Sequence, residues 1–215
     1  MNRVNILLVD DHELFRSGLK SILQNRHDLL VMDEAASGEE AIEKVRKKLP
    51  DLVLMDVNMP GIGGMETTRR LRRMYPELLV IAVTVLNNDP FPRQLLDAGA
   101  RGFVTKGDSA GELLTAIDAV LQGKYHISGS VAQKLALSGF KGEAEASPLA
   151  MLSPREMQTM LMIARGKSTG EISDVMYLSP KTVSTFRKRL FEKLGVASNV
   201  ELSHLALRYK LVDPL

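Results

Sequence analysis

Polar side chains stand at the ends of four short apolar runs in the first half of the chain. Asp10 and Asp11 follow the first of these runs, and Asp56 closes another. Thr84 ends a third run, and Lys106 follows a fourth. If the runs are parallel strands, their carboxyl ends share one edge of a sheet, which is where open α/β sheets bind ligands. These five residues would then meet at a single site.

Three carboxylates brought together repel one another unless a cation joins them. Mg²⁺ suits such a site, because it takes oxygen ligands from one or two carboxylates together with water and phosphate. A carboxylate can also act as a nucleophile that accepts a phosphoryl group. Lys106 and Thr84 would then meet the charge on that group, one as a cation and one as a hydroxyl donor. A lone Asp-Asp pair is more often a solvent-facing turn, so the prediction depends on the whole set.

The elements that would position these residues alternate along residues 4–122. Five apolar, β-branched runs are each followed by a stretch with helical periodicity, which predicts an α/β fold with a five-stranded, doubly wound parallel sheet. The predicted strands are 5–9, 30–34, 52–56, 79–84 and 102–105, and the predicted helices are 12–24, 37–48, 65–74, 92–98 and 109–122. Ser37 with Glu40 is the pattern of a capping box at the second helix.

The pattern changes after residue 122. Residues 123–150 are rich in Gly, Ser, Lys and Glu, which predicts a polar linker with room for a helix over 127–137. Beyond them the strand signal stops. Ser153, Pro154 and Glu156 form a helix-start pattern. Helices are expected over 154–165, 169–176, 180–194 and 199–209, so residues 151–215 should form a small all-α domain.

Composition excludes several classes of site. The 215 residues contain no cysteine, so there is no disulfide framework, thiolate zinc site, iron–sulfur cluster or cysteine nucleophile. The apolar run at 4–9 is far shorter than the about 20 residues that cross a bilayer, and it lacks the signs of a signal peptide. We therefore expect a cytoplasmic protein with no membrane partner.

The net charge of +2 conceals an uneven distribution. Residues 1–122 carry 15 basic and 18 acidic side chains, a net charge of −3. Residues 123–150 carry 3 and 2, a net charge of +1, and residues 151–215 carry 10 and 6, a net charge of +4. The small helical domain is therefore the basic one.

The predicted helix 180–194 combines an apolar stripe with a basic, hydroxyl-rich side. Val183, Leu190 and Leu194 would face the core. Away from this stripe lie Lys181, Ser184, Thr185 and Lys188. A helix–turn–helix places such an N-terminal segment in the major groove, where Lys neutralises phosphates and Ser or Thr contacts base edges weakly. A helical bundle with a basic solvated face is the alternative interpretation of this helix alone.

Three segments resemble response-regulator receiver domains over about residues 4–122: Leu8-Val9-Asp10-Asp11-His12, Leu54-Met55-Asp56-Val57-Asn58-Met59-Pro60-Gly61 and Thr105-Lys106. The resemblance implies that Asp56 accepts phosphate from a phosphohistidine on a sensor histidine kinase. It implies that Mg²⁺ is held by Asp10, Asp11, Asp56 and the backbone carbonyl of Asn58. It further implies that Thr84 and Lys106 contact the phosphoryl oxygens and that Phe103 is the switch aromatic, which turns inward on phosphorylation.

Three later segments resemble the LuxR/NarL/FixJ type of DNA-binding domain over about residues 151–212: Leu152-Ser153-Pro154-Arg155-Glu156, Glu171-Ile172-Ser173 and Leu178-Ser179-Pro180-Lys181-Thr182-Val183. The resemblance implies that Thr182 and the basic residues Lys181, Arg187 and Lys188 grip phosphates of double-stranded promoter DNA. Ser184, Thr185 and Lys188 match the positions that approach the bases. The helix 199–209 is the usual dimer contact, and Phe186 stands where the family often has His.

Nearly the whole chain resembles the GacA/UvrY/SirA type of global regulator. The segments that carry this resemblance are Pro60-Gly61-Ile62-Gly63-Gly64-Met65-Glu66, Thr84-Val85 with Asp89-Pro90-Phe91-Pro92, Leu178-Ser179-Pro180-Lys181-Thr182-Val183 and Phe191-Glu192-Lys193-Leu194. This resemblance implies a sensor kinase of the hybrid, multi-step type and targets that include promoters of small regulatory RNAs. Together with the changes of pattern and charge along the chain, the resemblances predict a receiver domain (1–122), a linker (123–150) and a DNA-binding domain (151–215). We expect a transcription regulator that is not an enzyme, in which phosphorylation releases an occluded helix–turn–helix and favours a homodimer on two half-sites.

Two rival functions stay open at this point. One is a Mg²⁺-dependent phosphohydrolase with an aspartyl-phosphate intermediate, but such an enzyme needs an acid two residues after its nucleophile, and residue 12 is His. The other is a regulator that binds DNA without using phosphate.

Two further sequence patterns can be tested only with a structure. Pro90 and Pro92 predict a short or late fourth helix, and we interpret Arg69, Arg70, Arg72 and Arg73 as a solvated face rather than a nucleic-acid site.

Overall fold

The computed structural model describes residues 3–85, 91–129, 131–133, 148–209 and 211–212. The chain divides into two compact units. Among the described residues, those up to Gln133 belong to the first unit and those from Pro148 onward to the second. No helix in these described ranges is long and apolar enough to cross a membrane.

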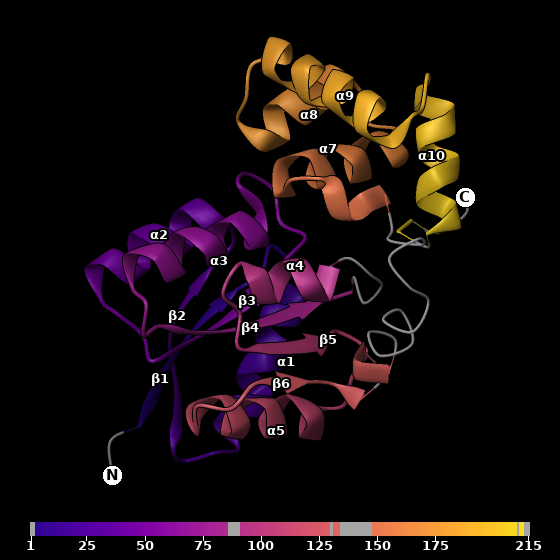
Figure 1. The fold of residues 1–215 in the computed structure, drawn as a ribbon. Coiled ribbons are helices and arrows are strands. Elements are labelled where there is room, and N and C mark those ends of the chain that lie inside the picture. The colour runs from indigo at the N-terminus through magenta and orange to yellow at the C-terminus, as the bar shows by residue number, and fades with distance from the viewer. Residues whose placement is uncertain (1–2, 86–90, 130, 134–147, 210, 213–215) are drawn as a thin grey trace. The chain divides into compact units, whose positions relative to one another are not determined.

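The first unit is built on a parallel sheet with the strand order β2-β1-β3-β4-β5-β6 (Figure 1). The strands are β1 (Val4–Val9), β2 (Leu29–Ala35), β3 (Leu52–Asp56), β4 (Leu79–Thr84), β5 (Gly102–Thr105) and β6 (His126–Ile127). The predicted α/β class is confirmed, but the sheet has six strands rather than five. The sixth is a two-residue edge strand, too short to show a periodicity.

Helices cover both faces of this sheet (Figure 1). They are α1 (Glu13–Gln24), α2 (Gly38–Lys47), α3 (Gly63–Met74), α4 (Phe91–Asp97) and α5 (Ala110–Leu121). Alternate residues of each strand enter two separate cores. On β1, Ile6 and Leu8 pack with buried residues of α1 and α5, whereas Leu7 and Val9 pack with those of α2 and α3. Burial on both faces explains why the strands are continuous apolar runs.

The structure tests two local predictions of the first unit, the capping box at α2 and the short fourth helix. Ser37 Oγ accepts a hydrogen bond from the Glu40 N–H at 3.2 Å, but the Glu40 carboxylate accepts from the Ala36 N–H at 2.8 Å, so the predicted reciprocal box does not form. The same carboxylate also pairs with Lys44 on the next turn, at 2.9 Å. The predicted short fourth helix is α4, which has 7 residues, whereas Pro90 lies outside the described residues.

Three of the four arginines of α3 have partners within the first unit, and Arg73 is exposed. Arg69 and Arg70 pair with Glu66 at 3.1 and 2.9 Å. Arg72 donates to the backbone carbonyl of Leu78 at 2.8 Å. These contacts support the interpretation of a solvated, locally paired face.

The second unit consists of helices alone in its described residues. They are the short 3₁₀ helix η2 (Pro148–Met151), α7 (Pro154–Ala164), α8 (Thr169–Met176), α9 (Pro180–Leu194) and α10 (Asn199–Arg208). The four predicted α-helices are confirmed to within a residue at each end. The helix expected over 127–137 differs: Ile127 belongs to β6, residues 129 and 131–133 are helical, and residues 134–137 lie outside the described part.

A capping box and an ion pair tie the start of α7 to the end of α9. Ser153 and Glu156 cap each other's backbone N–H groups, as predicted. The Glu156 carboxylate is 3% exposed and lies 2.6 Å from Lys193 Nζ, which also donates to the Met151 carbonyl at 3.0 Å. Burial alone would raise the pKa of Glu156, but the hydrogen bonds from Lys193 and Ser153 outweigh it and hold that pKa below its usual value.

We expect Glu156→Gln to lower the free energy of unfolding of the second unit by about 1–3 kcal/mol, because a buried charge-assisted pair is lost. A carboxyl whose folded pKa is depressed stabilises the fold above its unfolded pKa, and this contribution disappears as the pH falls through the folded pKa. As the pH is lowered, the stability of the Glu156→Gln variant should therefore fall less than that of the parent. Urea unfolding of the full chain, with hydrogen exchange read on α7 and α9, measures both effects.

The matched control is Glu192→Gln. Glu192 is exposed and lies 3.8 Å from the exposed Lys188, so its loss should cost less than about 0.5 kcal/mol. Equal effects of the two substitutions would contradict the role given to Glu156.

Candidate functional site

The residues at the carboxyl edge of the sheet come together as expected. Because β3 lies between β1 and β4, Asp56 at the end of β3 is next to both Asp10 and Thr84. Asp10 and Asp56 are each 2% exposed, and Thr84 is fully buried. Lys106 Nζ lies 2.6 Å from Asp10 Oδ2 and 3.0 Å from Asp56 Oδ2. One lysine therefore bridges two buried carboxylates.

The possible metal-ligating atoms of this site, three carboxylate oxygens and one imidazole nitrogen, form a compact set. One ligand atom each from Asp10, Asp11, His12 and Asp56 lies within 4.8 Å of all the others. His12 was missed as a member of the set, and its Nδ1 lies 3.0 Å from Asp11 Oδ1. Three carboxylates face one lysine, so the site carries excess negative charge. This donor chemistry fits a hard divalent cation.

The backbone around Asp56 is held by a close helix contact. The Asn58 N–H donates to Asp56 Oδ1 at 3.1 Å. The first turn of α3 packs so closely that a Cβ on Gly64 would lie 1.7 Å from the Asp56 carbonyl oxygen, and the Gly64 N–H donates to the Val57 carbonyl at 3.0 Å. Gly64 is therefore required as a glycine. The sequence shows the Gly63-Gly64 pair but not what it packs against.

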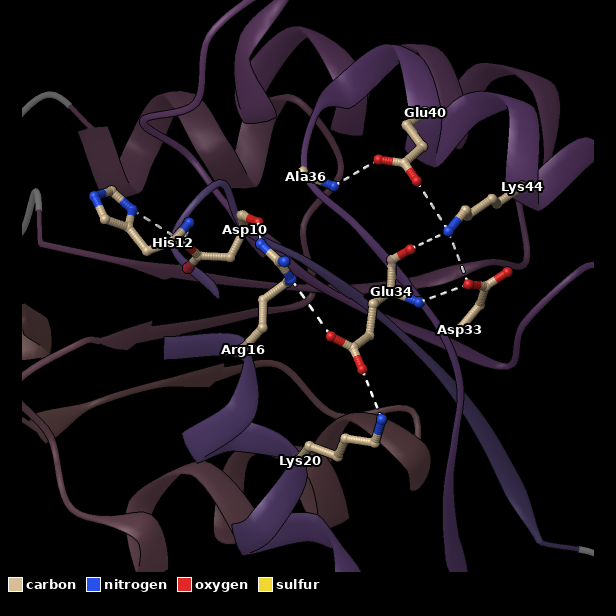
Figure 2. A network of polar contacts seen from close by, with 9 residues as sticks. All are labelled: Asp10, His12, Arg16, Lys20, Asp33, Glu34, Ala36, Glu40 and Lys44. Atoms are coloured by element: carbon tan, nitrogen blue, oxygen red, sulfur yellow. Dashed lines mark hydrogen bonds and ion pairs between the residues drawn. The ribbon is translucent and has the colours of Figure 1, made fainter. Parts of the chain in front are cut away.

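Residues of α1 complete the site from the other side. The Phe15 ring lies 4.5 Å from Lys106 Nζ, a cation–π contact, and Arg16 donates to the Asp10 carbonyl at 2.6 Å. Figure 2 shows that Arg16 belongs to a network of ion pairs joining α1, β2 and α2. Its other members are Lys20, Asp33, Glu34, Glu40 and Lys44. The network holds the two helices beside the site.

Burial and mutual charge set the titration of the two central groups. Burial raises the pKa of Asp56; Lys106 opposes this shift, Asp10 adds to it, and the net change is upward. Burial lowers the pKa of Lys106, but Asp56 and Asp10 raise it more, so this lysine stays protonated. Burial therefore disfavours the ionised form of Asp56, and a bound cation would favour it.

We expect the stability of the first unit to respond to the pH through Asp56. A carboxyl with a raised folded pKa stabilises the fold below its unfolded pKa, and this contribution is lost as the pH rises through the folded pKa. In Mg²⁺-free buffer, Asp56→Asn should therefore lack this loss and unfold at a higher temperature than the parent at pH 7. Thermal unfolding of the full chain between pH 4 and 8 measures the difference. A variant less stable than the parent at pH 7 would contradict the assignment.

The predicted switch aromatic lies inside the receiver unit. Phe103 is fully buried, and Lys106, three residues further along the chain, pairs with Asp56 at 3.0 Å. The backbone carbonyl of Phe103 accepts a hydrogen bond from the Ser128 N–H at 3.2 Å, and Phe103 is aligned with Ile127 of β6. The residue therefore joins the site to the last strand of the unit.

A second candidate surface lies on α9. Ser179 caps the helix by accepting from the Thr182 N–H at 3.2 Å. Val183 and Leu190 are buried and Leu194 is half-buried, as the predicted stripe requires. The exposed residues on the rest of the helix include Lys181, Ser184, Thr185, Arg187 and Lys188, with Thr182 half-buried. The Thr185 hydroxyl donates to the Lys181 carbonyl at 2.9 Å, so toward an external group it acts as an acceptor.

Comparisons with known proteins show which protein family has these two sites. The chain matches the family model of the response regulator receiver domain over residues 6–118 and that of bacterial regulatory proteins of the luxR family over residues 150–206. The chain belongs to the LuxR family of response regulators. It is therefore a phosphorylation-dependent transcription regulator with a receiver domain and a DNA-binding domain, and not an enzyme.

Full-length relatives support the assignment to the LuxR family. The response regulator GacA of Pseudomonas viridiflava is 49% identical over 210 residues, which cover 98% of both chains. The response regulator UvrY of Escherichia coli K12 is 45% identical over 210 residues, covering 98% of this chain and 96% of UvrY. The resemblance to the GacA and UvrY type, first seen in the sequence motifs, is confirmed.

Solved response-regulator structures share the fold. RcsB of Salmonella typhimurium has a TM-score of 0.76 at 26% identity, with all of both chains covered. RcsB bound to the promoter rprA in the presence of the phosphomimetic BeF₃⁻ has a TM-score of 0.70 at 26% identity, covering 95% of this chain and 98% of that one.

Proposed function

We propose that Asp56 is the residue at which this response regulator is phosphorylated. One Asp56 carboxylate oxygen attacks the phosphorus of a phosphohistidine, a P–O bond forms, the P–N bond breaks, and the leaving imidazole takes a proton. The observation that carries this proposal is the pair of contacts from Lys106 to Asp10 and Asp56, which places a protonated amine where phosphoryl charge would arrive. The Thr84 hydroxyl would contact another phosphoryl oxygen.

The acidic cluster also supports a proposed Mg²⁺ site. Asp10, Asp11, Asp56 and the backbone carbonyl of Asn58 would hold the ion, which would supply positive charge to the transferred phosphoryl oxygens. Asp10 and Asp56 are buried and share one lysine, so neutralising them is favourable in this site. The Asn58 N–H bond to Asp56 Oδ1 fixes the turn from which the carbonyl ligand would come.

Incubating the chain with acetyl phosphate and Mg²⁺ tests this proposal. The expected result is labelling that approaches one phosphoryl group per chain and maps to Asp56 by mass spectrometry. Sustained release of phosphate from added phosphoesters, with no labelled protein, would contradict it and favour the phosphohydrolase alternative.

We further propose that Lys181, Thr182, Ser184, Thr185, Arg187 and Lys188 form the face that binds double-stranded promoter DNA. The observation supporting this is their shared exposure on a helix whose opposite stripe is buried. Lys181, Thr182, Arg187 and Lys188 would contact phosphates, while Ser184, Thr185 and Lys188 would reach bases. Exposed apolar side chains on α10, Val200 and Leu207, support α10 as the surface at which two copies pair on DNA.

Signal transfer and partners complete the proposal. Phosphorylation would draw Thr84 and Lys106 toward the phosphoryl group and shift the environment of Phe103, which is bonded to β6. We retain the division into a receiver over 1–122, a linker over 123–150 and a DNA-binding domain over 151–215, with β6 as an extension of the receiver. The relation to GacA and UvrY supports a hybrid sensor kinase as phosphodonor and small regulatory RNA promoters among the targets.

A further inference from the structure

Helix α8 ends in a backbone conformation that its residue disfavours. Tyr177 has φ 52° and ψ 48°, the left-handed region. Among the described residues it is the one non-glycine with positive φ. The residues that follow the ends of α4, α5, α7 and α9 in the same region are Gly99, Gly123, Gly166 and Gly195. The chain thus uses glycine at comparable helix ends and tyrosine at this one.

The turn itself needs no tyrosine side chain. The Leu178 N–H donates to the Ser173 carbonyl at 3.0 Å, and the Tyr177 N–H donates to the Asp174 carbonyl at 3.3 Å. This backbone pattern closes a helix when one residue is left-handed, a position that Gly and Asn occupy with less strain. The phenol ring therefore contributes nothing that the local backbone requires.

The side chain also has no partner among the described residues. Tyr177 is 75% exposed, and among the described residues its side chain makes no hydrogen bond or cation–π contact. Tyr125 is an instructive comparison, because it is similarly exposed but has the Arg101 guanidinium 4.7 Å from its ring centre. A strained, exposed and unpartnered aromatic residue is a reason to look for an external ligand.

The position of Tyr177 in the fold indicates that the external ligand is DNA. It lies two residues before Ser179, the cap of α9, and so at the end of α9 that carries the exposed Lys181 and Ser184. A duplex that receives the start of α9 in its major groove brings its sugar–phosphate backbone to the flanking turn. An exposed tyrosine there offers an apolar ring to a deoxyribose and an O–H donor to a phosphate oxygen.

We propose that Tyr177 is a DNA-contacting residue, whose ring packs on a deoxyribose and whose hydroxyl donates to a phosphate beside the α9 site. This inference rests on the DNA-binding face proposed above. It adds a contact outside the recognition helix and accounts for a tyrosine where glycine would be less strained.

Three variants of the full chain test the proposal: Tyr177→Gly, Tyr177→Asn and Tyr177→Phe. DNA affinity is measured by fluorescence anisotropy on a duplex selected from genomic fragments, and stability by thermal unfolding. The Gly and Asn variants should unfold at the same or a higher temperature, because both residues accept the left-handed conformation. They should bind about tenfold more weakly, the loss expected for one hydrogen bond to a charged phosphate. The Phe variant should fall between them and the parent.

The salt dependence provides a readout that a structural role would not give. Tyr177 carries no charge, so its loss should leave the slope of log affinity against log salt unchanged, whereas Lys181→Ala should reduce that slope by about one. Unchanged affinity in the Gly and Asn variants would overturn the proposal. So would a joint loss of stability and affinity, since it would make the ring structural.

Two further outcomes distinguish failure of the Tyr177 contact from failure of the DNA-binding face proposed on α9. If DNA affinity is unchanged but transcription falls, Tyr177 contacts another protein and the proposal is wrong. If Lys181→Ala and Lys188→Ala also leave affinity unchanged, the α9 face itself is wrong. A loss in the lysine variants but not in the Tyr177 variants overturns only the new contact.

Discussion

A chain carrying Asp56→Asn is expected to take up no phosphoryl group from acetyl phosphate or from a phosphohistidine donor. The amide nitrogen and oxygen of Asn are poor nucleophiles, and no other buried carboxylate of the site ends a strand next to Thr84. Asp10 is the nearest alternative acceptor, because it is equally buried and also contacts Lys106, so peptide mapping must locate any residual label. The expected loss is complete within the detection limit of intact-mass spectrometry.

The matched control for this experiment is Asp97→Asn. Asp97 is an exposed carboxylate at the end of α4, and its substitution changes the net charge by the same amount. It should label as the parent does. Labelling of the Asp56→Asn chain at the parent level would contradict the assignment, and labelling that moves to Asp10 or Asp11 would show that the acceptor is not unique.

The second large effect is expected from Lys181→Ala combined with Lys188→Ala. Both side chains are exposed on α9, and each would neutralise one phosphate. The double variant should bind all DNA sequences roughly a hundredfold more weakly, at about tenfold for each charged contact. The slope of log affinity against log salt should fall by about two. Anisotropy titrations at several salt concentrations measure both quantities.

Lys47→Ala combined with Lys48→Ala provides the control for net charge. Both lysines are exposed at the end of α2 in the receiver domain, away from α9 in the sequence and in a different compact unit. This pair should leave the salt slope unchanged. If the α9 variant changed sequence preference without changing the slope, its lysines would read bases rather than grip phosphates.

Much of the fold follows from patterns that depend on near neighbours in the chain. The strands β3, β4 and β5 have the predicted bounds because both of their faces are buried, which leaves unbroken apolar runs. The start of α7 was predictable because Ser153 and Glu156 cap each other across three residues. The end of α9 was predictable because Gly195 takes a left-handed conformation that glycine tolerates.

Features that depend on contacts between residues distant in the sequence could not be predicted from local patterns. The contact of Phe15 with Lys106 joins the first turn of α1 to the residue that follows β5, 91 positions later in the chain. The need for Gly64 follows from the approach of α3 to the Asp56 carbonyl. Periodicity places each residue on an element, but it does not say which elements touch.

The candidate site shows the same division. The strand-end rule was sufficient to collect Asp10, Asp56, Thr84 and Lys106, because parallel strands end at one edge. The state of the site was not predictable. Lys106 bridges two carboxylates, and Phe103 is buried beside a strand that the sequence does not reveal. Both features depend on side-chain contacts between elements that are distant in the sequence.

The central claim is that phosphorylation of Asp56 raises the affinity of the full chain for DNA. The most direct test measures that affinity on one selected duplex, in Mg²⁺, with and without the phosphomimetic BeF₃⁻. A coupling of typical size predicts about 5–150-fold tighter binding with the phosphomimetic, and no change in the Asp56→Asn chain. Equal affinity of the parent in both conditions, or the same gain in Asp56→Asn, would contradict the claim.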